Sequence, residues 1–541
     1  MTGAQLVLSL LATALPVIPA QYISLKGASL NASTPFPDAF VSFSIEFSSF
    51  PDFAGNHSSP NVFSDNLLNN LGNLQGTKPY IRVGGNTQDY ALYNSSLDVA
   101  LKGTYNLSRS ADYPTTIEIG TSFFESYATW PGVKFSHGFN MGLVGRTPAA
   151  WETLRETVPL ACKALWPDRW YWWSYGNEMD LYPTSSQGPV RPADWNETDF
   201  VKEYLNGTAE IKALVEEHCP SLLSSGSYGY LAPNFGGTAN RLKAPAAFSA
   251  GLYEDKSIKL FSTHNYISGA TSPGVTLQGT LMNHTRTMLS VDAHVAEYNK
   301  IWPSGGGPPM IMSETNSLYN EGKPGLSNTF GAALWGVDFN LYCASVGIRR
   351  VHMHIGTDYR YGSWQPLTTN KTTMGTKAPY YGNIAVAAFL GDTTRSPVSI
   401  VSPPLSSPHE AAYAAYRTTS HGSSSLARVV LLNMRAYNTT EGGTGLGYAP
   451  GPLPPRPVRT YTLDVDGAGL RAGVRVGVQR LMANGSDAIT GITWDGWSYA
   501  YELVGGRPVR LENVTTGEEA VVKLGKLRVE VPDSSAVVLS F

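Results

Sequence analysis

The sequence contains little cysteine, and this scarcity excludes several classes of protein. Only three cysteines occur in 541 residues, at Cys162, Cys219 and Cys343, so the fold cannot depend on a disulfide framework or a cysteine-rich metal site. One disulfide at most can form. Cys162 with Cys219 is the expected pair and Cys343 the expected buried free thiol, although sequence alone leaves the connectivity open.

Runs of basic residues and long apolar stretches are also missing. Lys plus Arg (39) nearly balance Asp plus Glu (42), so the charge pattern indicates neither nucleic acid nor an anionic membrane as a partner. After the N-terminus no apolar stretch approaches about twenty residues, and no transmembrane helix is predicted. With 42% hydrophobic and 15% charged residues, the chain has a globular composition. Its length favours one large domain with a smaller companion.

The first twenty residues are apolar and end at Ala20, before the polar Gln21. This is typical of a secretory signal peptide, although no Lys or Arg opens it, and Pro16 and Pro19 argue against a buried helix instead. N-glycosylation triplets are dense along the chain, which favours a secreted, extracellular protein with surface N-glycans. The triplets begin at Asn31, Asn56, Asn94, Asn106, Asn196, Asn206, Asn283, Asn370, Asn438, Asn484 and Asn513.

Eight short strand-like runs alternate with helical or loop-like spacers over the first two thirds of the chain. Such alternation predicts parallel strands joined by right-handed crossovers, and eight units make a (β/α)8 TIM barrel of the α/β class. The expected strands are Phe40–Phe47, Tyr80–Asn86, Ile117–Phe123, Trp170–Glu178, Ser224–Gly229, Leu260–Tyr266, Pro309–Asn316 and Arg349–Ile355.

After about residue 380 the pattern changes to alternating segments separated by Gly, Pro, Asn and Ser, which predicts an antiparallel β-sandwich domain. The strand-like runs are Ala427–Asn433, Arg459–Val465, Val474–Leu481 and Ala520–Phe541. The Gly/Pro-rich stretch Gly442–Pro457 is expected to be a surface loop. We therefore divide the chain into a signal peptide (1–20), an N-terminal strand expected to join the β-domain (21–35), the catalytic barrel (36–380) and the C-terminal β-domain (381–541).

Two glutamates stand at the C-terminal ends of expected strands four and seven, the barrel face that carries active sites. Glu178 follows the aromatic run that begins at Trp170, whose apolar wall would raise the carboxyl pKa, as a general acid requires. Glu314 ends a rigid strand and is the expected nucleophile. Retaining glycosidases hold two such carboxyls about 5 Å apart, whereas inverting enzymes need a wider gap. An exposed loop residue and a helix cap are the plain structural alternatives for Glu178 and Glu314.

Several motifs surround these glutamates. Asn177-Glu178 and Ser313-Glu314-Thr-Asn-Ser match the acid/base and nucleophile motifs of retaining barrel glycosidases. Three further blocks together span most of the barrel: Tyr80-Ile-Arg-Val-Gly-Gly-Asn86-Thr-Gln-Asp-Tyr90, Ser262-Thr-His-Asn-Tyr266, and Glu314 to Tyr319 with Leu326 to Trp335. Through these blocks the chain resembles glycoside hydrolase family 79, which includes heparanase and microbial β-glucuronidases.

The resemblance implies specific substrate contacts. Glu46 and Asn86 would contact sugar hydroxyls, and Asn177 would bind the 2-hydroxyl, an interaction that strengthens in the transition state. Tyr266 would orient Glu314. Tyr319 and Tyr361 would lie near the uronate carboxylate or the sugar ring and recognise the anion through hydroxyls and backbone N–H groups.

One departure from the family pattern concerns the nucleophile loop. Heparanase-like members have consecutive glycines just after the tyrosine, but this chain reads Tyr319-Asn320-Glu321-Gly322, which brings an acid near the expected anion site, unless Glu321 points to solvent. His264 could tune a carboxylate or could equally be a core histidine. His352 and His354 share one strand face, and barrel packing is favoured over metal ligation because no third ligand has suitable spacing.

The leading hypothesis is a retaining exo-β-glucuronidase that removes terminal β-glucuronic acid, or its 4-O-methyl form, from glycans by double displacement. No metal or organic cofactor is expected. A heparanase-like endo-β-glucuronidase is the second hypothesis, disfavoured because a sulfated polymer would need Lys and Arg clusters. A related retaining β-glycosidase of other sugar specificity and a non-catalytic carbohydrate-binding barrel remain as alternatives.

Overall fold

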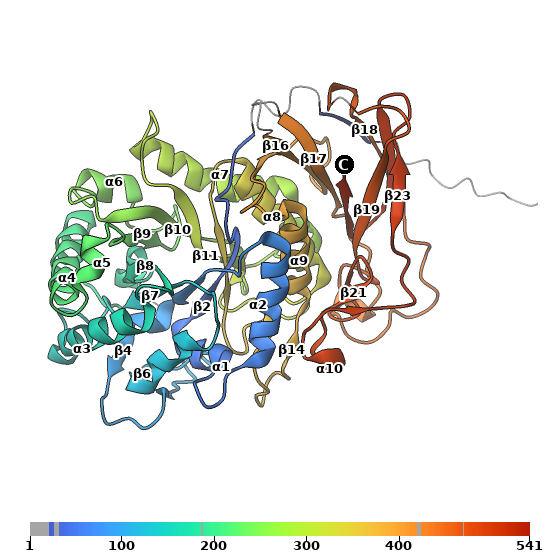
Figure 1. Cartoon of the computed structure of the whole chain (residues 1–541). Coiled ribbons are helices and arrows are strands. Elements are labelled where there is room, and N and C mark those ends of the chain that lie inside the picture. The colour runs from blue at the N-terminus through green and yellow to red at the C-terminus, as the bar shows by residue number, and fades with distance from the viewer. Residues whose placement is uncertain (1–20, 26–31, 185–187, 419–423, 469) are drawn as a thin grey trace, which may run out of the picture.

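The computed structural model describes residues 21–25, 32–184, 188–418, 424–468 and 470–541. The expected signal peptide, residues 1–20, lies outside these described residues, as does the triplet at Asn31. Two domains lie side by side, a barrel with surrounding helices and a β-sandwich (Figure 1). Within the described part of the chain, no helix is both long and apolar enough to cross a membrane.

Eight parallel strands close into the predicted barrel, which confirms the fold class. Their buried, β-branched and aromatic side chains suit strands covered on both faces. The barrel strands are β2 (Val41–Glu46), β3 (Ile81–Gly84), β7 (Phe135–Phe139), β8 (Trp170–Tyr175), β9 (Tyr230–Phe235), β10 (Ile258–Gly269), β11 (Met310–Tyr319) and β12 (Val351–Ile355).

Two of the expected barrel strands were wrong. Thr116–Ile119 forms β6, which pairs with β4 (Ala91–Tyr93) and β5 (Leu101–Thr104) in a separate three-stranded sheet. The third barrel strand is β7 instead. The segment expected as strand five, Ser224–Gly229, is not a strand. Its first residue is the last residue of helix α5 (Pro220–Ser224), and the fifth barrel strand, β9, begins only at Tyr230.

Helices cover the outside of the barrel. They are α1 (Phe50–Ala54), α2 (Val62–Gln75), α3 (Pro148–Leu165), α4 (Glu197–His218), α5, α6 (Ala244–Ser249), α7 (His284–Ile301), α8 (Phe330–Ser345) and α9 (Ala378–Leu390). The expected disulfide Cys162–Cys219 is present and ties the end of α3 to the end of α4, while Cys343 is a buried free thiol in α8.

Helix α9 packs against α8 and α2 and so completes the helical layer. It crosses the boundary expected at residue 380, and the chain leaves the barrel only after Leu390. Helix α8 is buried from Phe330 to Ala344 because the barrel lies on one side and strands β15 (Val398–Val401) and β16 (Glu410–Thr418) on the other. A helix that is apolar all round is stable only in such a setting.

The C-terminal domain is a sandwich of two sheets. Strand β1 (Gln21–Ser24) pairs in parallel with β18 (Val458–Asp464), which pairs with β24 (Lys526–Pro532) in a three-stranded sheet. The larger sheet contains β15 (Val398–Val401), β16 (Glu410–Thr418), β17 (Ser424–Asn433), β19 (Arg475–Met482), β20 (Thr493–Trp494), β21 (Trp497–Ser498), β22 (Val509–Arg510), β23 (Glu518–Val521) and β25 (Ser535–Ser540). An apolar core fills the space between the sheets. The Gly442–Pro457 stretch is irregular apart from a 3-10 turn at its start.

Candidate active site

The expected site residues meet in one cavity of about 610 Å³ at the C-terminal ends of the barrel strands. This is the face where barrel enzymes carry their active sites. Both glutamates line it, as do all of the expected substrate contacts. Those contacts are Glu46, Asn86, Asn177, Tyr266, Tyr319 and Tyr361.

Glu178 and Glu314 face each other although 136 residues separate them in sequence. One oxygen of each carboxyl and one ring nitrogen of His264 all lie within 4.8 Å of one another. Glu178 follows β8 with a φ of 49°, in the left-handed region that non-glycine residues seldom adopt and that is enriched at functional sites. Glu314 lies within β11, which continues past it to Tyr319.

The two carboxyls differ in their electrostatic surroundings. Burial, reinforced by the charge of Glu314, raises the pKa of Glu178. Burial acts in the same direction on Glu314, but the charges of His354 and Arg82 outweigh it and the hydroxyl of Tyr266 helps, so the pKa of Glu314 is lowered. Near neutral pH the pair therefore holds one proton, on Glu178, and one negative charge, on Glu314.

Arg82 provides the most direct counter-charge for Glu314. Its guanidinium lies 2.5 Å from Oε2 of Glu314 and donates at 2.6 Å to Oδ1 of Asn177. Arg82 is completely buried on β3, where an unpaired cation would be costly. On the other side of Glu314, the hydroxyl of Tyr266 donates to Oε1 at 2.9 Å. Both carboxylate oxygens are therefore held in place.

Two histidines lie close to the carboxyls. His264 has Nδ1 3.0 Å from Oε1 of Glu178, and burial lowers the His264 pKa to about 3, so this ring is neutral at neutral pH. His354 lies 3.4 Å from Oε2 of Glu46 and 3.8 Å from Oε2 of Glu314. Burial opposes its protonation, but these two carboxyls raise the His354 pKa above its ordinary value.

His352 lies elsewhere, with Nδ1 3.2 Å from the carbonyl of Phe43 and its ring stacked on Tyr171. Among the described residues the one candidate cluster of metal ligands is Glu178, His264 and Glu314 themselves. A cation there would require Glu178 to be ionised, which its burial disfavours.

The expected sugar contacts surround the pair. Asn177 donates to Asn86 at 3.0 Å. Glu46 is buried and accepts bonds from the backbone N–H of Thr87 and the hydroxyl of Tyr359. A side chain at Gly85, where φ is 109°, would collide with the Glu46 carboxyl, which explains the glycine in the Gly84-Gly85 motif.

The aromatic contacts differ in exposure. Tyr361 is buried with its ring 6.0 Å from that of Tyr266, whereas Tyr319 is 47% exposed at the cavity rim. Glu321 also lines the cavity, so the interpretation that it points to solvent was wrong. It lies 3.6 Å from Arg360, and burial, together with Asp112 nearby, raises the Glu321 pKa to about 7.

Sequence reasoning missed several residues that build the site. Asp89 accepts bonds from the backbone of Met141 and Asn177 and from the hydroxyl of Tyr182, so it joins three loops at the rim. Asp180 accepts from Gly236 and Asn240 at 2.8 Å each and fixes the next loop. The signal for Arg82 was present, because an arginine within the apolar run Ile81-Arg82-Val83 needs a buried partner.

Comparison with known proteins agrees with this geometry. The model of the glycosyl hydrolase family 79 C-terminal β-domain matches residues 412–538. A β-glucuronidase of Neurospora crassa is 61% identical over 503 residues, which is 90% of this chain and 89% of that protein. A β-glucuronidase of Aspergillus niger is 54% identical over 516 residues, which is 94% of this chain and 92% of that protein.

A solved structure shares the fold over nearly the whole chain. It is a 4-O-α-L-rhamnosyl-β-D-glucuronidase from Fusarium oxysporum, with a TM-score of 0.70 and 22% identity, and it covers 96% of this chain and 100% of that one. The barrel, the facing carboxyls and these relatives define a glycoside hydrolase. Within that class, the chain belongs to glycoside hydrolase family 79.

Proposed function

We propose that the protein is a retaining exo-β-glucuronidase, in which Glu314 attacks the anomeric carbon while Glu178 protonates the leaving oxygen. The observation that carries this proposal is the facing pair, with oxygens within 4.8 Å and pKa values shifted in opposite directions. That separation suits double displacement, because inversion needs room for a water between sugar and base. The two relatives from Neurospora crassa and Aspergillus niger are both β-glucuronidases, which supports glucuronic acid as the sugar.

In the first step Glu314 bonds to C1 and the C1–O bond to the aglycone breaks, with the Glu178 proton moving to the departing oxygen. In the second step Glu178, now a carboxylate, removes a proton from water as that water attacks C1 and releases Glu314. Arg82 and Tyr266 hold Glu314 ionised and aligned before the first step. Asn177, fixed by Arg82 and Asp89, is positioned to bind the 2-hydroxyl.

The uronate carboxylate is proposed to lie near Tyr319 and Tyr361, with Glu321 protonated below pH about 7. Glu46 and Asn86 would hold ring hydroxyls deeper in the cavity. None of the described residues lining the cavity is Lys or Arg, so a densely sulfated chain finds no counter-charge there. This favours exo-action on terminal glucuronate or 4-O-methyl-glucuronate over the endo-cleavage of a sulfated polymer.

A secretory route is part of the same proposal. Every described N-glycosylation triplet has its asparagine at least partly exposed, as attachment of a glycan requires. The expected signal peptide, residues 1–20, is consistent with this route. The proposed setting is therefore extracellular, with glucuronate-bearing glycans as substrates.

The sugar assignment is tested with a set of p-nitrophenyl β-glycosides. The glucuronide should be the best substrate, and turnover of the glucoside or xyloside without the glucuronide would contradict the assignment.

The catalytic roles of Glu314 and Glu178 are tested by azide rescue. Glu314→Ala with azide should give the α-glucuronosyl azide, whereas Glu178→Ala should give the β-azide from an activated substrate. The opposite stereochemistry would exchange the two roles.

A further inference from the structure

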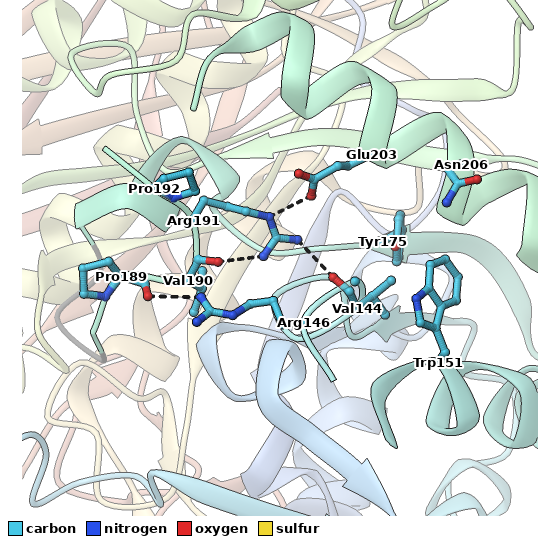
Figure 2. A pocket seen from close by; sticks show the side chains of 11 residues that line it. Val144, Arg146, Trp151, Tyr175, Pro189, Val190, Arg191, Pro192, Glu203 and Asn206 are labelled. Atoms are coloured by element: carbon cyan, nitrogen blue, oxygen red, sulfur yellow. Dashed lines mark hydrogen bonds and ion pairs between the residues drawn. The ribbon is translucent and has the colours of Figure 1, made fainter. Parts of the chain in front are cut away.

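A second hollow lies outside the barrel, between α3 and α4 (Figure 2). Two adjoining cavities of about 540 and 580 Å³ share Gly145, Arg146, Trp151 and Asn206. We call them together the α3–α4 groove. Its volume falls in the range of small-molecule sites, but of its lining residues only Val190 also lines the catalytic cavity.

The helices bring Trp151 and Asn206 to the same place in this groove. Arg155 of α3 pairs with Glu210 of α4 at 3.1 Å. Trp151 and Asn206 stand four residues before these partners, and residues four apart share a helix face. Since α3 and α4 belong to successive units of a parallel barrel and run in the same direction, the indole and the amide face each other one turn earlier (Figure 2).

Asn206 opens the triplet Asn206-Gly207-Thr208, and packing explains its second and third residues but not its first. A Cβ at Gly207 would lie 2.1 Å from the Tyr175 hydroxyl, so the ring that floors the groove requires glycine there. Thr208 is buried and donates to the carbonyl of Leu205 at 3.1 Å. Asn206 is exposed in the middle of a helix, where asparagine is a poor choice.

We propose that Asn206 carries an N-linked glycan whose innermost N-acetylglucosamine units lie in the α3–α4 groove against Trp151. The chemistry of the groove suits this occupant. The half-buried indole offers an apolar face to a sugar ring. Arg146 is exposed, and among the described residues it donates one bond, to the carbonyl of Pro189 at 3.2 Å. Its other N–H groups can reach sugar hydroxyl or acetamido oxygens.

Because the glycan is covalently attached to Asn206, even a weak contact with the groove is enough to hold it there. A short flexible tether gives an effective concentration in the millimolar range, so a groove with sub-millimolar affinity for the sugar is mostly occupied. The occupant is thus the chain's own glycan, not a second substrate. This inference rests on the proposed secretory route, and its test distinguishes a failure of the inference from a failure of that route.

The test is site-resolved release of glycans from the native, full-length secreted protein. An endoglycosidase that cleaves between the two innermost N-acetylglucosamines is applied, and glycopeptide mass spectrometry follows each site. Asn206 should be occupied, and its glycan should be released about tenfold more slowly than the glycans at the other occupied sites. Asn196, the N-cap residue of the same helix, is the nearest match among those sites. Denaturation should abolish the difference.

Trp151→Ala should remove most of this protection while leaving hydrolysis of the aryl glucuronide unchanged. Glu216→Ala, an exposed change on α4 outside the groove, should keep the protection. If Trp151→Ala misfolds, Arg146→Gln provides the same test with a smaller change. An unoccupied Asn206 beside occupied sites elsewhere, or equal release rates in the native protein, would overturn the inference and leave the secretory route intact. A secreted protein with no occupied site at all would also overturn the inference, whereas a protein that stays inside the expressing cell without glycans would overturn both.

Discussion

Arg82 and Glu314 form an ion pair across the barrel, from β3 to β11, with a separation of 2.5 Å. Neither side chain has appreciable solvent exposure, so each charge depends on the other. Together with His354, Arg82 lowers the pKa of Glu314 against the opposing effect of burial, which keeps the nucleophile ionised. It also connects Glu314 to Asn177, because the same guanidinium donates to both.

Replacing Arg82 by Met should lower kcat/KM by about two to three orders of magnitude, because a preorganised charge is lost. The acid limb of the pH profile should move to higher pH, since the Glu314 pKa rises when the cation is removed. Arg82→Lys should recover part of both effects. An acid limb at the same pH in a folded Met variant would contradict this role.

Tyr266→Phe removes the hydroxyl bond to the other oxygen of Glu314. One hydrogen bond to a charged group contributes about 1.5–3 kcal/mol, so kcat should fall by about tenfold or more while KM changes little. Steady-state kinetics on the aryl glucuronide measure this. A change confined to KM would instead assign Tyr266 to substrate binding.

Much of this architecture follows from the sequence, and the errors have physical causes. Two expected strands were misplaced because β7 contains His137 and Gly138 and β9 contains Pro233, which weaken strand signals although the barrel tolerates them. Glu178 and Glu314 could be found because each ends or lies in a strongly apolar run. Asp89 and Asp180 could not, since their partners come from loops that are distant in sequence. The position of Arg82 in the run Ile81-Arg82-Val83 indicated a buried partner but did not identify it as Glu314 on β11.

Glu178→Gln should stabilise the fold while it abolishes most activity. A carboxyl whose folded pKa is raised binds its proton more tightly when folded, so wild-type stability falls as pH rises from about 4.5 through the folded pKa. Glutamine has no such dependence. The gain in Tm over wild type should therefore increase with pH across that window, and a constant or shrinking gain in thermal melts would contradict the raised pKa.

Glu321 should make substrate binding sensitive to pH near neutrality. Below pH about 7 its carboxyl is protonated, and above that pH its charge would repel a uronate. Asp112, Arg360, Glu46 and His354 also act on its pKa. KM for the aryl glucuronide should rise above pH 7 in the wild type and stay flatter in Glu321→Gln. The same pH dependence of KM in both proteins would place the uronate elsewhere.

The most direct test of the central claim is the anomeric configuration of the first product. In proton NMR of p-nitrophenyl β-glucuronide hydrolysis, the β-anomer of glucuronic acid should appear first and the α-anomer only later, through mutarotation. That order is the result of double displacement at Glu314 with Glu178 as acid and base. If the α-anomer appears first, the reaction inverts, and the two carboxyls do not act as proposed.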